Sequence, residues 1–500
     1  MTEAAAYAEL ERRFARLNAL DGAGAVLDWD SQTMMPKGGA ETRAEQSAAL
    51  ALVGHELLTD PTLAELLDRA EADEAAGLDP WRAANLAEMR RRWIHAAATE
   101  ARLVEALSKA TSACEMRWRT ARPDDDFAGL RPSFEEVVAL TRESAAARGE
   151  ALGCAPYDAL LDEYEPGGRS ARIDALFADL AAYLPGFIAQ ALEHQAGKPA
   201  PRRLDGPFPV AAQRALGRRL MAVVGFEFEH GRLDVSDHPF CGGTPDDVRI
   251  TTRYREDDFT KAMMAVLHET GHAMYERGLP SEWRRQPVGQ AAGMSLHESQ
   301  SLLLEMQACR SREFIAFAAP LMREAFGRDG TAWQADNLLR LSTRVEASLI
   351  RVDADEVTYP AHILLRYRLE KALIAGDLEV RDLPDAWHEG MAELLGVTPL
   401  DDRDGCLQDV HWFGGLFGYF PTYTLGAMIA AQLFAAARRA DADILPAIGR
   451  GDFVPLFRWL RANVHGLGSS LTTDELVAQA TGRPLDAAVF KAHLEARYLS

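Results

Sequence analysis

Helical periodicity runs through nearly the whole chain and limits the folds that it can adopt. Leucine, alanine and aromatic residues recur three and four positions apart, between stretches rich in Glu and Arg. This spacing gathers apolar side chains on one face of an α-helix. The N-terminal stretch is the first example, because its apolar face would carry Tyr7, Leu10, Phe14 and Leu17. We therefore predict a mainly α fold.

Clusters of Pro and Gly interrupt this pattern, and none is long or polar enough to be a flexible linker between domains. They are MMPKGG (34–39), LDP (78–80), ARPDDD (121–126), YEPGGR (164–169), GKPAPRR (197–203) and FGYFP (417–421). We predict a single domain over residues 1–500, with an N-terminal helical part to about residue 225 and a second part from about residue 226.

The charge balance excludes several classes of partner. The chain has 75 acidic and 54 basic residues, which leaves a formal net charge of −21. Such a surface repels phosphate backbones and anionic lipids, so we expect neither nucleic acid nor membrane as a partner. No unbroken apolar run approaches the roughly 18 residues that cross a bilayer. The N-terminus also lacks the apolar stretch of a signal peptide.

The cysteines point to a reducing compartment. They are odd in number, widely scattered and without a C-x-x-C pair: Cys114, Cys154, Cys241, Cys309 and Cys406. This pattern is unlike a disulfide framework or a thiolate zinc site. We expect a cytoplasmic protein.

One region departs from the helical pattern. RLDV (232–235) and VRITTRY (248–254) are short and rich in β-branched residues, and a turn-rich segment separates them. They predict a small β ribbon just before the next helix. Asp257 and Asp258 would then supply an N-cap and a first-turn acid for that helix.

That helix contains the sequence HETGH at 268–272. Residues four apart lie on one helix face, so His268 and His272 would present two imidazole rings to one point, with Glu269 beside them. In zinc metallopeptidases two such histidines hold the ion, and the glutamate takes a proton from the water that the ion acidifies. With 13 His in 500 positions, chance would produce this pattern about 0.05 times, yet two histidines on a helix face can also be ordinary surface residues.

A catalytic zinc needs a third protein ligand and an open position for water. The third ligand is not the histidine of the metzincin pattern H-E-x-x-H-x-x-G-x-x-H, because this chain has Tyr275 and Gly278 where that pattern requires Gly and His. The remaining source is a glutamate from a second helix. Glu298 lies 26 positions after His272 in GMSLHESQSLLLE, which leaves room for a loop and a packed return helix. A glutamate there could instead reach solvent or cap a neighbour.

At this point the chain resembles the metallocarboxypeptidases of the thermostable carboxypeptidase Taq type. The resemblance rests on six motifs in order: HPF (238–240), D-x-R-x-T (Asp247, Arg249, Thr251), HETGH (268–272), HESQ (297–300), IRVDAD (350–355) and GCLQDVHW (405–412). It extends from LDWDSQTMMPKGGAETRAEQ near residue 27 to GYFPTYTLGA at 418–427. Cys241 departs from the threonine expected after HPF, which affects only the local hydrogen bonding of that turn.

The resemblance implies a helical, saddle-shaped homodimer with a long active-site groove and a small sheet beside the HETGH helix. Each subunit would bind one divalent metal, with Zn favoured over Co or Mn. The substrate would be a peptide with a free C-terminal carboxylate. From it the enzyme would release single amino acids with broad specificity.

Further site residues follow from the chemistry and from the matched motifs. An exopeptidase must bind the terminal carboxylate, and the resemblance gives this role to Arg351, although an Arg near Asp353 and Asp355 could equally form an internal ion pair. The oxyanion of the tetrahedral intermediate needs a donor besides the metal. The candidate polar groups of the site are His411 and Tyr423 as catalytic donors, and Gln408 and His238 as parts of the substrate-binding wall.

Two other functions share parts of this pattern. A metal-dependent endo- or oligopeptidase can use the same His-Glu-His site with a distant glutamate. A non-catalytic peptide-binding scaffold could retain a relict site, but here the three ligands and the base are all intact. We therefore predict a metallocarboxypeptidase.

Overall fold

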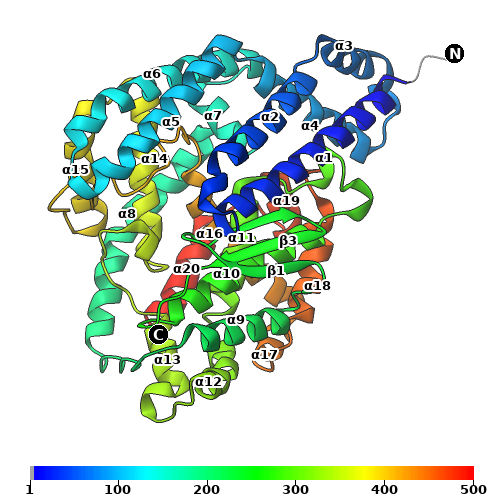
Figure 1. Ribbon diagram of the computed structural model, residues 1–500. Coiled ribbons are helices and arrows are strands. Elements are labelled where there is room, and N and C mark those ends of the chain that lie inside the picture. Colours follow the sequence, from blue (N-terminus) through cyan, green and yellow to red (C-terminus); the bar gives the residue numbers. More distant parts are fainter. Residues whose placement is uncertain (1–4) are drawn as a thin grey trace. The chain divides into compact units, whose positions relative to one another are not determined.

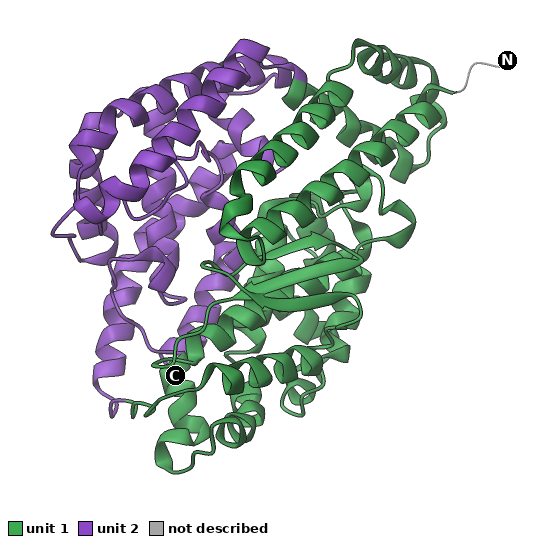
Figure 2. Cartoon of the chain, in the orientation of Figure 1, with its two compact units in different colours: residues 1–96, 201–342, 429–485 green, residues 97–200, 343–428, 486–500 purple. Residues whose placement is uncertain are grey.

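The computed structural model describes residues 5–500 and divides the chain into two compact units. Figure 2 shows them in green and purple. The first unit contains residues 1–96, 201–342 and 429–485, and the second contains residues 97–200, 343–428 and 486–500. The chain therefore passes between the units several times. The organisation into one domain with a change near residue 225 stays a prediction.

The first unit is helical with one small sheet (Figure 1). Its elements are α1 (Ala6–Thr33), α2 (Ala40–Leu58), α3 (Pro61–Arg69), α4 (Pro80–Ala97), α9 (Val210–Val224), β1 (Gly231–Val235), β2 (Cys241–Thr244), β3 (Asp247–Thr252), α10 (Thr260–Gly278), α11 (Met294–Leu302), α12 (Arg312–Phe326), α13 (Ala335–Ser342), α17 (Ile444–Ile448), α18 (Val454–Asn463) and α19 (Thr473–Thr481). The predicted mainly α fold is confirmed.

The second unit is built from helices joined by loops in the part of the chain that the structure describes. They are α5 (Ala101–Asp124), α6 (Phe127–Leu152), α7 (Pro156–Tyr164), α8 (Ser170–Ala196), α14 (Tyr359–Ala375), α15 (Leu383–Leu395) and α20 (Ala487–Tyr498). A further helix, α16 (Pro421–Ala440), begins in the second unit and ends in the first.

The N-terminal helix has the apolar face that its periodicity predicts. Tyr7, Leu10, Phe14 and Leu17 are all buried. They join one hydrophobic cluster with apolar residues of α3 and α4, including Leu67. Burial of each such side chain contributes about 1.5–3 kcal/mol, so this face fixes α1 within its unit.

The sheet contains one strand more than the sequence predicts. Its order is β1-β3-β2, in which β1 is parallel to β3 and β2 is antiparallel to it. The two predicted strands are therefore neighbours, but they do not form a simple hairpin. The missed strand, β2, begins at Cys241 and contains two glycines, so it lacks the β-branched pattern that marks a strand. Cys241 lies in a strand rather than in the expected turn.

One face of the sheet packs against the helix that carries HETGH. Leu233, Val248 and Ile250 form a buried cluster with Val266 and Ala273 of α10. These apolar residues occupy the side of α10 that faces the sheet, which leaves the HETGH histidines on another side. The sheet thus fixes the rotation of α10 about its axis.

The start of α10 differs from the predicted cap, because its N-cap residue is Phe259, whose side chain makes no capping hydrogen bond. The Oδ1 atom of Asp258 accepts a hydrogen bond from the backbone N–H of Thr260 at 2.8 Å. Asp257 instead forms an ion pair with Arg255 at 2.6 Å. Both acids therefore lie before the N-cap residue, and neither is the N-cap or an acid of the first turn.

Helix α8 is an exception to the expectation that no segment is long and apolar enough to cross a membrane. α8 has 27 residues and a mean hydropathy of 1.4 in its most apolar window, so by length and composition alone it could cross a membrane. The apolar stretch of α8 is not unbroken, because charged residues such as Asp174 and Asp179 interrupt it. The buried core helices of other proteins pass the same test, so one such helix does not establish a membrane span.

Helices α10 and α11 approach each other closely at Gly271, the fourth residue of HETGH. A Cβ atom added there would lie 2.5 Å from the carbonyl oxygen of Gln300 and 2.6 Å from the Cα atom of Ser301. Both contacts are with backbone, which cannot move aside as a flexible side chain can. Glycine inside a helix costs about 1 kcal/mol relative to alanine, and here it permits the close contact between the two helices.

We predict that Gly271→Ala destabilises the protein by about 1–3 kcal/mol, because the added methyl group pushes α11 away from α10. Gly54→Ala is the matched control, since Gly54 also lies inside a helix and a Cβ there meets nothing within 4 Å. Gly54→Ala should stabilise by about 0.5–1 kcal/mol. Thermal unfolding of both metal-free variants measures the difference, and equal melting temperatures would show that the contact at Gly271 is not tight.

Candidate active site

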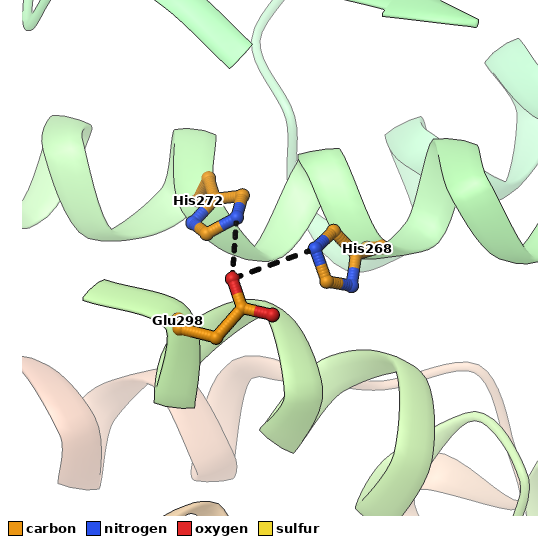
Figure 3. A group of neighbouring side chains, drawn as sticks. All are labelled: His268, His272 and Glu298. Atoms are coloured by element: carbon orange, nitrogen blue, oxygen red, sulfur yellow. Dashed lines mark ion pairs between the residues drawn. The ribbon is translucent and has the colours of Figure 1, made fainter. Parts of the chain in front are cut away.

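Three predicted metal ligands come together in the first unit. His268 and His272 project from α10 toward the carboxylate of Glu298, which comes from α11 (Figure 3). The Oε2 atom of Glu298 lies 3.4 Å from Nε2 of His272 and 3.8 Å from Nε2 of His268. One ligand atom from each residue lies within 4.8 Å of the other two. The i, i+4 spacing and the close packing of α11 produce this arrangement.

These donor atoms fit a divalent transition metal. Two imidazoles and one carboxylate are the ligands that catalytic zinc sites use, and they leave a position open for water. The three side chains are mostly buried, with exposed fractions of 20, 12 and 13%. A carboxylate and two imidazoles this close and this buried favour a cation among them.

The charges around the trio act on each residue differently. Burial lowers the pKa of His268, but the carboxylates of Glu298, Glu305 and Glu269 outweigh it and raise the pKa to about 10. Burial, together with the neighbouring His297, lowers the pKa of His272 to about 4. The site therefore has a strong excess of negative charge, and a cation would relieve it.

Glu269, the predicted base, follows His268 on α10 and is buried. Burial raises its pKa to about 7, with His268 acting in the opposite direction and Glu298 in the same one. A buried carboxylate with a pKa near neutrality can both accept and return a proton, which is what general acid–base catalysis needs.

Two outer groups surround the trio and were not assigned from the sequence. Glu305 accepts a hydrogen bond from Nδ1 of His268 at 3.0 Å, and Arg310 donates to Glu305 at 2.6 Å. His297 stacks on His272 with ring centroids 4.6 Å apart. A signal for Glu305 was present, because it follows Glu298 by seven residues, which is two helical turns.

The second unit contains another buried group of charged residues, around Arg351. The Nε and Nη2 atoms of Arg351 donate to Oδ1 of Asp409 at 3.0 and 2.8 Å, and Nη1 donates to the Tyr359 hydroxyl at 3.2 Å. Arg366, which is fully buried, donates to Oδ2 of the same aspartate at 2.6 Å. Arg351 therefore does form an internal ion pair, but its partner is Asp409 rather than Asp353 or Asp355.

Asp409 faces two guanidinium groups and balances only one of them. Burial raises the pKa of its carboxyl group, but Arg366 and Arg351 outweigh this effect and hold the pKa far below its usual range. Burial also lowers the pKa of the adjacent His362, and the two arginines act in the same direction, so this histidine stays neutral and adds no further positive charge. We call Arg351, Arg366 and Asp409 the arginine pair with its aspartate. Two guanidinium groups and one carboxylate give this group one net positive charge.

His411 and Tyr423 lie next to this group. Nε2 of His411 is 3.3 Å from the Tyr423 hydroxyl, and burial with the nearby Arg351 lowers the pKa of His411 to about 4. The side-chain oxygen of Gln408 accepts from the backbone N–H of Arg351 at 2.9 Å, and its Nε2 atom donates to backbone carbonyls that include Leu349. Gln408 thus holds the backbone that carries Arg351.

His238 of the HPF motif lies in the first unit and is exposed. Its backbone carbonyl accepts hydrogen bonds from the hydroxyl groups of Ser236 and Thr251 at 2.5 and 3.4 Å. The motif thus stabilises the loop before β2 through its backbone. A contact between its imidazole and the substrate stays a prediction.

Comparison with known proteins identifies the family. A model of the carboxypeptidase Taq (M32) metallopeptidases matches residues 9–498. The chain belongs to this family. Thermostable carboxypeptidase 1 of Thermus thermophilus is 44% identical, covering 100% of this chain and 99% of the relative.

Solved structures agree with this result. Metallocarboxypeptidase 1 of Trypanosoma cruzi superposes with a TM-score of 0.97 at 43% identity and covers 99% of each chain. The M32 carboxypeptidase of Deinococcus radiodurans superposes with a TM-score of 0.93 at 35% identity, covering 99% of this chain and 98% of that one. This M32 protein is therefore a metallocarboxypeptidase, an enzyme that uses a divalent metal and acts on peptides, and the predicted family and enzyme class are confirmed.

Proposed function

We propose that this M32 enzyme is a zinc carboxypeptidase that removes single amino acids from the C-terminus of peptides with broad specificity. The observation that supports zinc is the ligand set of His268, His272 and Glu298, since transition metals of intermediate softness prefer imidazole and carboxylate together. Co or Mn could occupy the same ligands, because affinity order alone does not decide which metal a cell supplies.

The proposed mechanism uses Glu269 as the residue that moves the proton. When bound, the metal acidifies a water molecule and polarises the scissile carbonyl group. Glu269 takes the proton of the attacking water and then delivers it to the nitrogen of the departing amino acid. Its burial supports this role, because a desolvated carboxylate is a stronger base than one in water.

We assign the terminal carboxylate of the substrate to Arg351. The support is electrostatic: the arginine pair with its aspartate has two buried cations and one buried anion. An uncompensated buried charge is costly, so an anion that joins the group would stabilise it. Guanidinium groups bind carboxylates through paired hydrogen bonds, and a peptide C-terminus is such an anion.

The remaining predicted residues have supporting roles in this proposal. The His411 imidazole and the Tyr423 hydroxyl, which are 3.3 Å apart, would donate to the oxyanion of the tetrahedral intermediate. Gln408 would fix the backbone of Arg351, and His238 would contribute to the substrate-binding wall.

We further propose that the enzyme is a cytoplasmic homodimer that binds neither nucleic acid nor membranes. The scattered cysteines support a reducing cytoplasm. The net charge of −21 argues against nucleic acid and anionic membrane as partners. Membership of the family supports a homodimer with one metal ion in each subunit.

The proposal predicts which peptides are cut. A peptide with a free C-terminal acid should lose single residues stepwise, while its C-terminal amide should resist, because only the acid offers an anion to Arg351. Chelation should abolish the reaction, and Zn or Co should restore it. Mass analysis of both peptides with metal-loaded and chelated enzyme measures this. Internal cleavage of both forms would favour an oligopeptidase, and no cleavage with any metal would favour a peptide-binding scaffold.

Glu269→Gln should reduce kcat by about 10²- to 10⁴-fold while zinc remains bound, because the amide cannot accept the proton and is not a metal ligand. Peptide assays combined with zinc analysis of the purified variant measure both properties. Turnover at the native rate would rule out Glu269 as the base. Loss of zinc together with turnover would show that Glu269 also supports the ligands.

Arg351→Met should raise KM for free-acid peptides by about 10- to 100-fold, since a hydrogen bond to a charged group contributes about 1.5–3 kcal/mol. The KM for amidated peptides, which the enzyme should cut only slowly, should change much less. Arg497→Met is the matched control, because Arg497 is also a partly buried arginine of the second unit, paired with Glu356 at 2.8 Å. Equal effects on acid and amide substrates would remove the proposed role of Arg351.

A further inference from the structure

We propose that Glu305, anchored by Arg310, is a positioning residue for the metal ligand His268. It would fix the ring orientation and the tautomer of that histidine and so increase the affinity of the site for its metal. This inference rests on the proposed metal site and adds two residues to it. It gives a role to a carboxylate that lies outside the ligand set.

The contacts form a continuous chain from the ligand outward. The Oε2 atom of Glu305 lies 3.0 Å from Nδ1 of His268, and Oε1 accepts from Nη2 of Arg310 at 2.6 Å. The side chains of Glu305 and Arg310 are 11% and 15% exposed. Each oxygen of the carboxylate thus has its own partner, which restricts the rotation of Glu305.

The local helix geometry places Glu305 beside His268. α11 continues into a π-helical turn, Leu303–Ala308, which contains Glu305. Glu298 lies in the α-helical part and Glu305 in the π turn, and both carboxylates face α10, because each lies close to a ring nitrogen of His268. The wider π turn changes the path of the backbone at this second carboxylate, and π turns occur often at functional sites.

The two carboxylates approach opposite edges of the same imidazole. Glu298 lies toward Nε2 of His268 at 3.8 Å, whereas Glu305 contacts Nδ1. A carboxylate at Nδ1 requires a proton on that nitrogen. The proton leaves the lone pair on Nε2, which points toward the site where a metal would bind. Without Glu305 the neutral ring could place its proton on either nitrogen.

The second histidine ligand lacks an equivalent partner. Nδ1 of His272 is buried and has no hydrogen-bond partner among the described residues. Its ring instead stacks on His297, whose Nε2 atom is 2.8 Å from Glu276. The orientation of His272 therefore depends on packing, while that of His268 depends on a hydrogen bond. Substitution of Glu305 should accordingly weaken metal binding more than substitution of Glu276.

The deciding experiment measures zinc affinity by competition with a chelator of known affinity, in the native protein and in Glu305→Gln. Glutamine is nearly isosteric, but its NH2 group would replace one of the two oxygens that face His268 and Arg310, and an NH2 group cannot accept a hydrogen bond. We expect zinc affinity to fall by more than about tenfold, the lower end of the usual effect of such outer contacts. The visible spectrum of the cobalt-loaded variant should also shift, because the orientation of one ligand changes.

Glu356→Gln is the matched control. Glu356 is also a buried glutamate that contacts a histidine and an arginine, with His493 and Arg497 each at 2.8 Å, but it belongs to the second unit. This variant should lose stability and keep native zinc affinity. If Glu305→Gln loses less than about tenfold in affinity, or no more than Glu356→Gln, the proposed role is wrong.

A double-mutant cycle tests whether Arg310 acts through Glu305. Arg310→Gln alone should weaken zinc binding, and it should add little in the Glu305→Gln background, because its partner is already lost. Additive effects would overturn the proposed chain of contacts. If Glu305→Gln fails to fold without metal, Arg310→Gln alone decides, and native zinc affinity in that variant would overturn the proposal.

These results are independent of the test of the proposed function. Native protein that binds no zinc and cuts no peptide would contradict the metal site itself. Native protein that binds zinc and cuts free-acid peptides, with unchanged zinc affinity in Glu305→Gln, would contradict only the role of Glu305.

Discussion

The close contact between α10 and α11 at Gly271 is the constraint on which the metal site depends. The i, i+4 spacing brings two histidines to one side of α10, but a third ligand must come from another helix. Because residue 271 has no side chain, the backbone of α11 can approach to a distance that a Cβ atom would forbid. Glu298 then reaches both imidazoles. The sheet contributes from another side, since its buried cluster fixes the rotation of α10.

Charge is distributed unevenly between two buried groups, one in each unit. Around His268 the carboxylates of Glu298, Glu305 and Glu269 are in excess. Around Asp409 the two guanidinium groups are in excess. Buried charge of one sign is costly unless a partner neutralises it, so the first group suits a metal dication and the second suits an anion. A metallocarboxypeptidase needs both kinds of site, because its substrate ends in a carboxylate and its chemistry needs a metal.

Each of these groups is held in place by hydrogen bonds from neighbouring residues. Gln408 uses its side-chain amide to hold the backbone at Arg351, and Asp409 orients the guanidinium. In the proposed metal site, Glu305 would do the same for His268. Hydrogen-bonded outer residues of this kind reduce the freedom of the groups that they hold, so less entropy is lost when a ligand or a transition state binds.

The sequence by itself determined the features that depend on near neighbours along the chain. Helical periodicity predicted a mainly α fold, and the spacing of His268 and His272 predicted one side of the metal site. The nearby Glu298 was also within reach of this reasoning, because only a loop separates its helix from α10. The ordered motifs gave the family, and with it the assignment of Arg351.

Tertiary structure decided the rest. The strand β2 has two glycines and no β-branched pattern, so only its hydrogen-bonded pairing with β3 reveals it, and the parallel pairing of β1 with β3 joins strands that β2 separates in the sequence. The partner of Arg351 is Asp409, 58 residues away, rather than the nearby Asp353 or Asp355. The interleaving of the two units likewise has no local signal. Helix periodicity is fixed by contacts three and four residues apart, whereas these features depend on which distant surfaces pack together, and packing selects partners by shape and burial rather than by spacing.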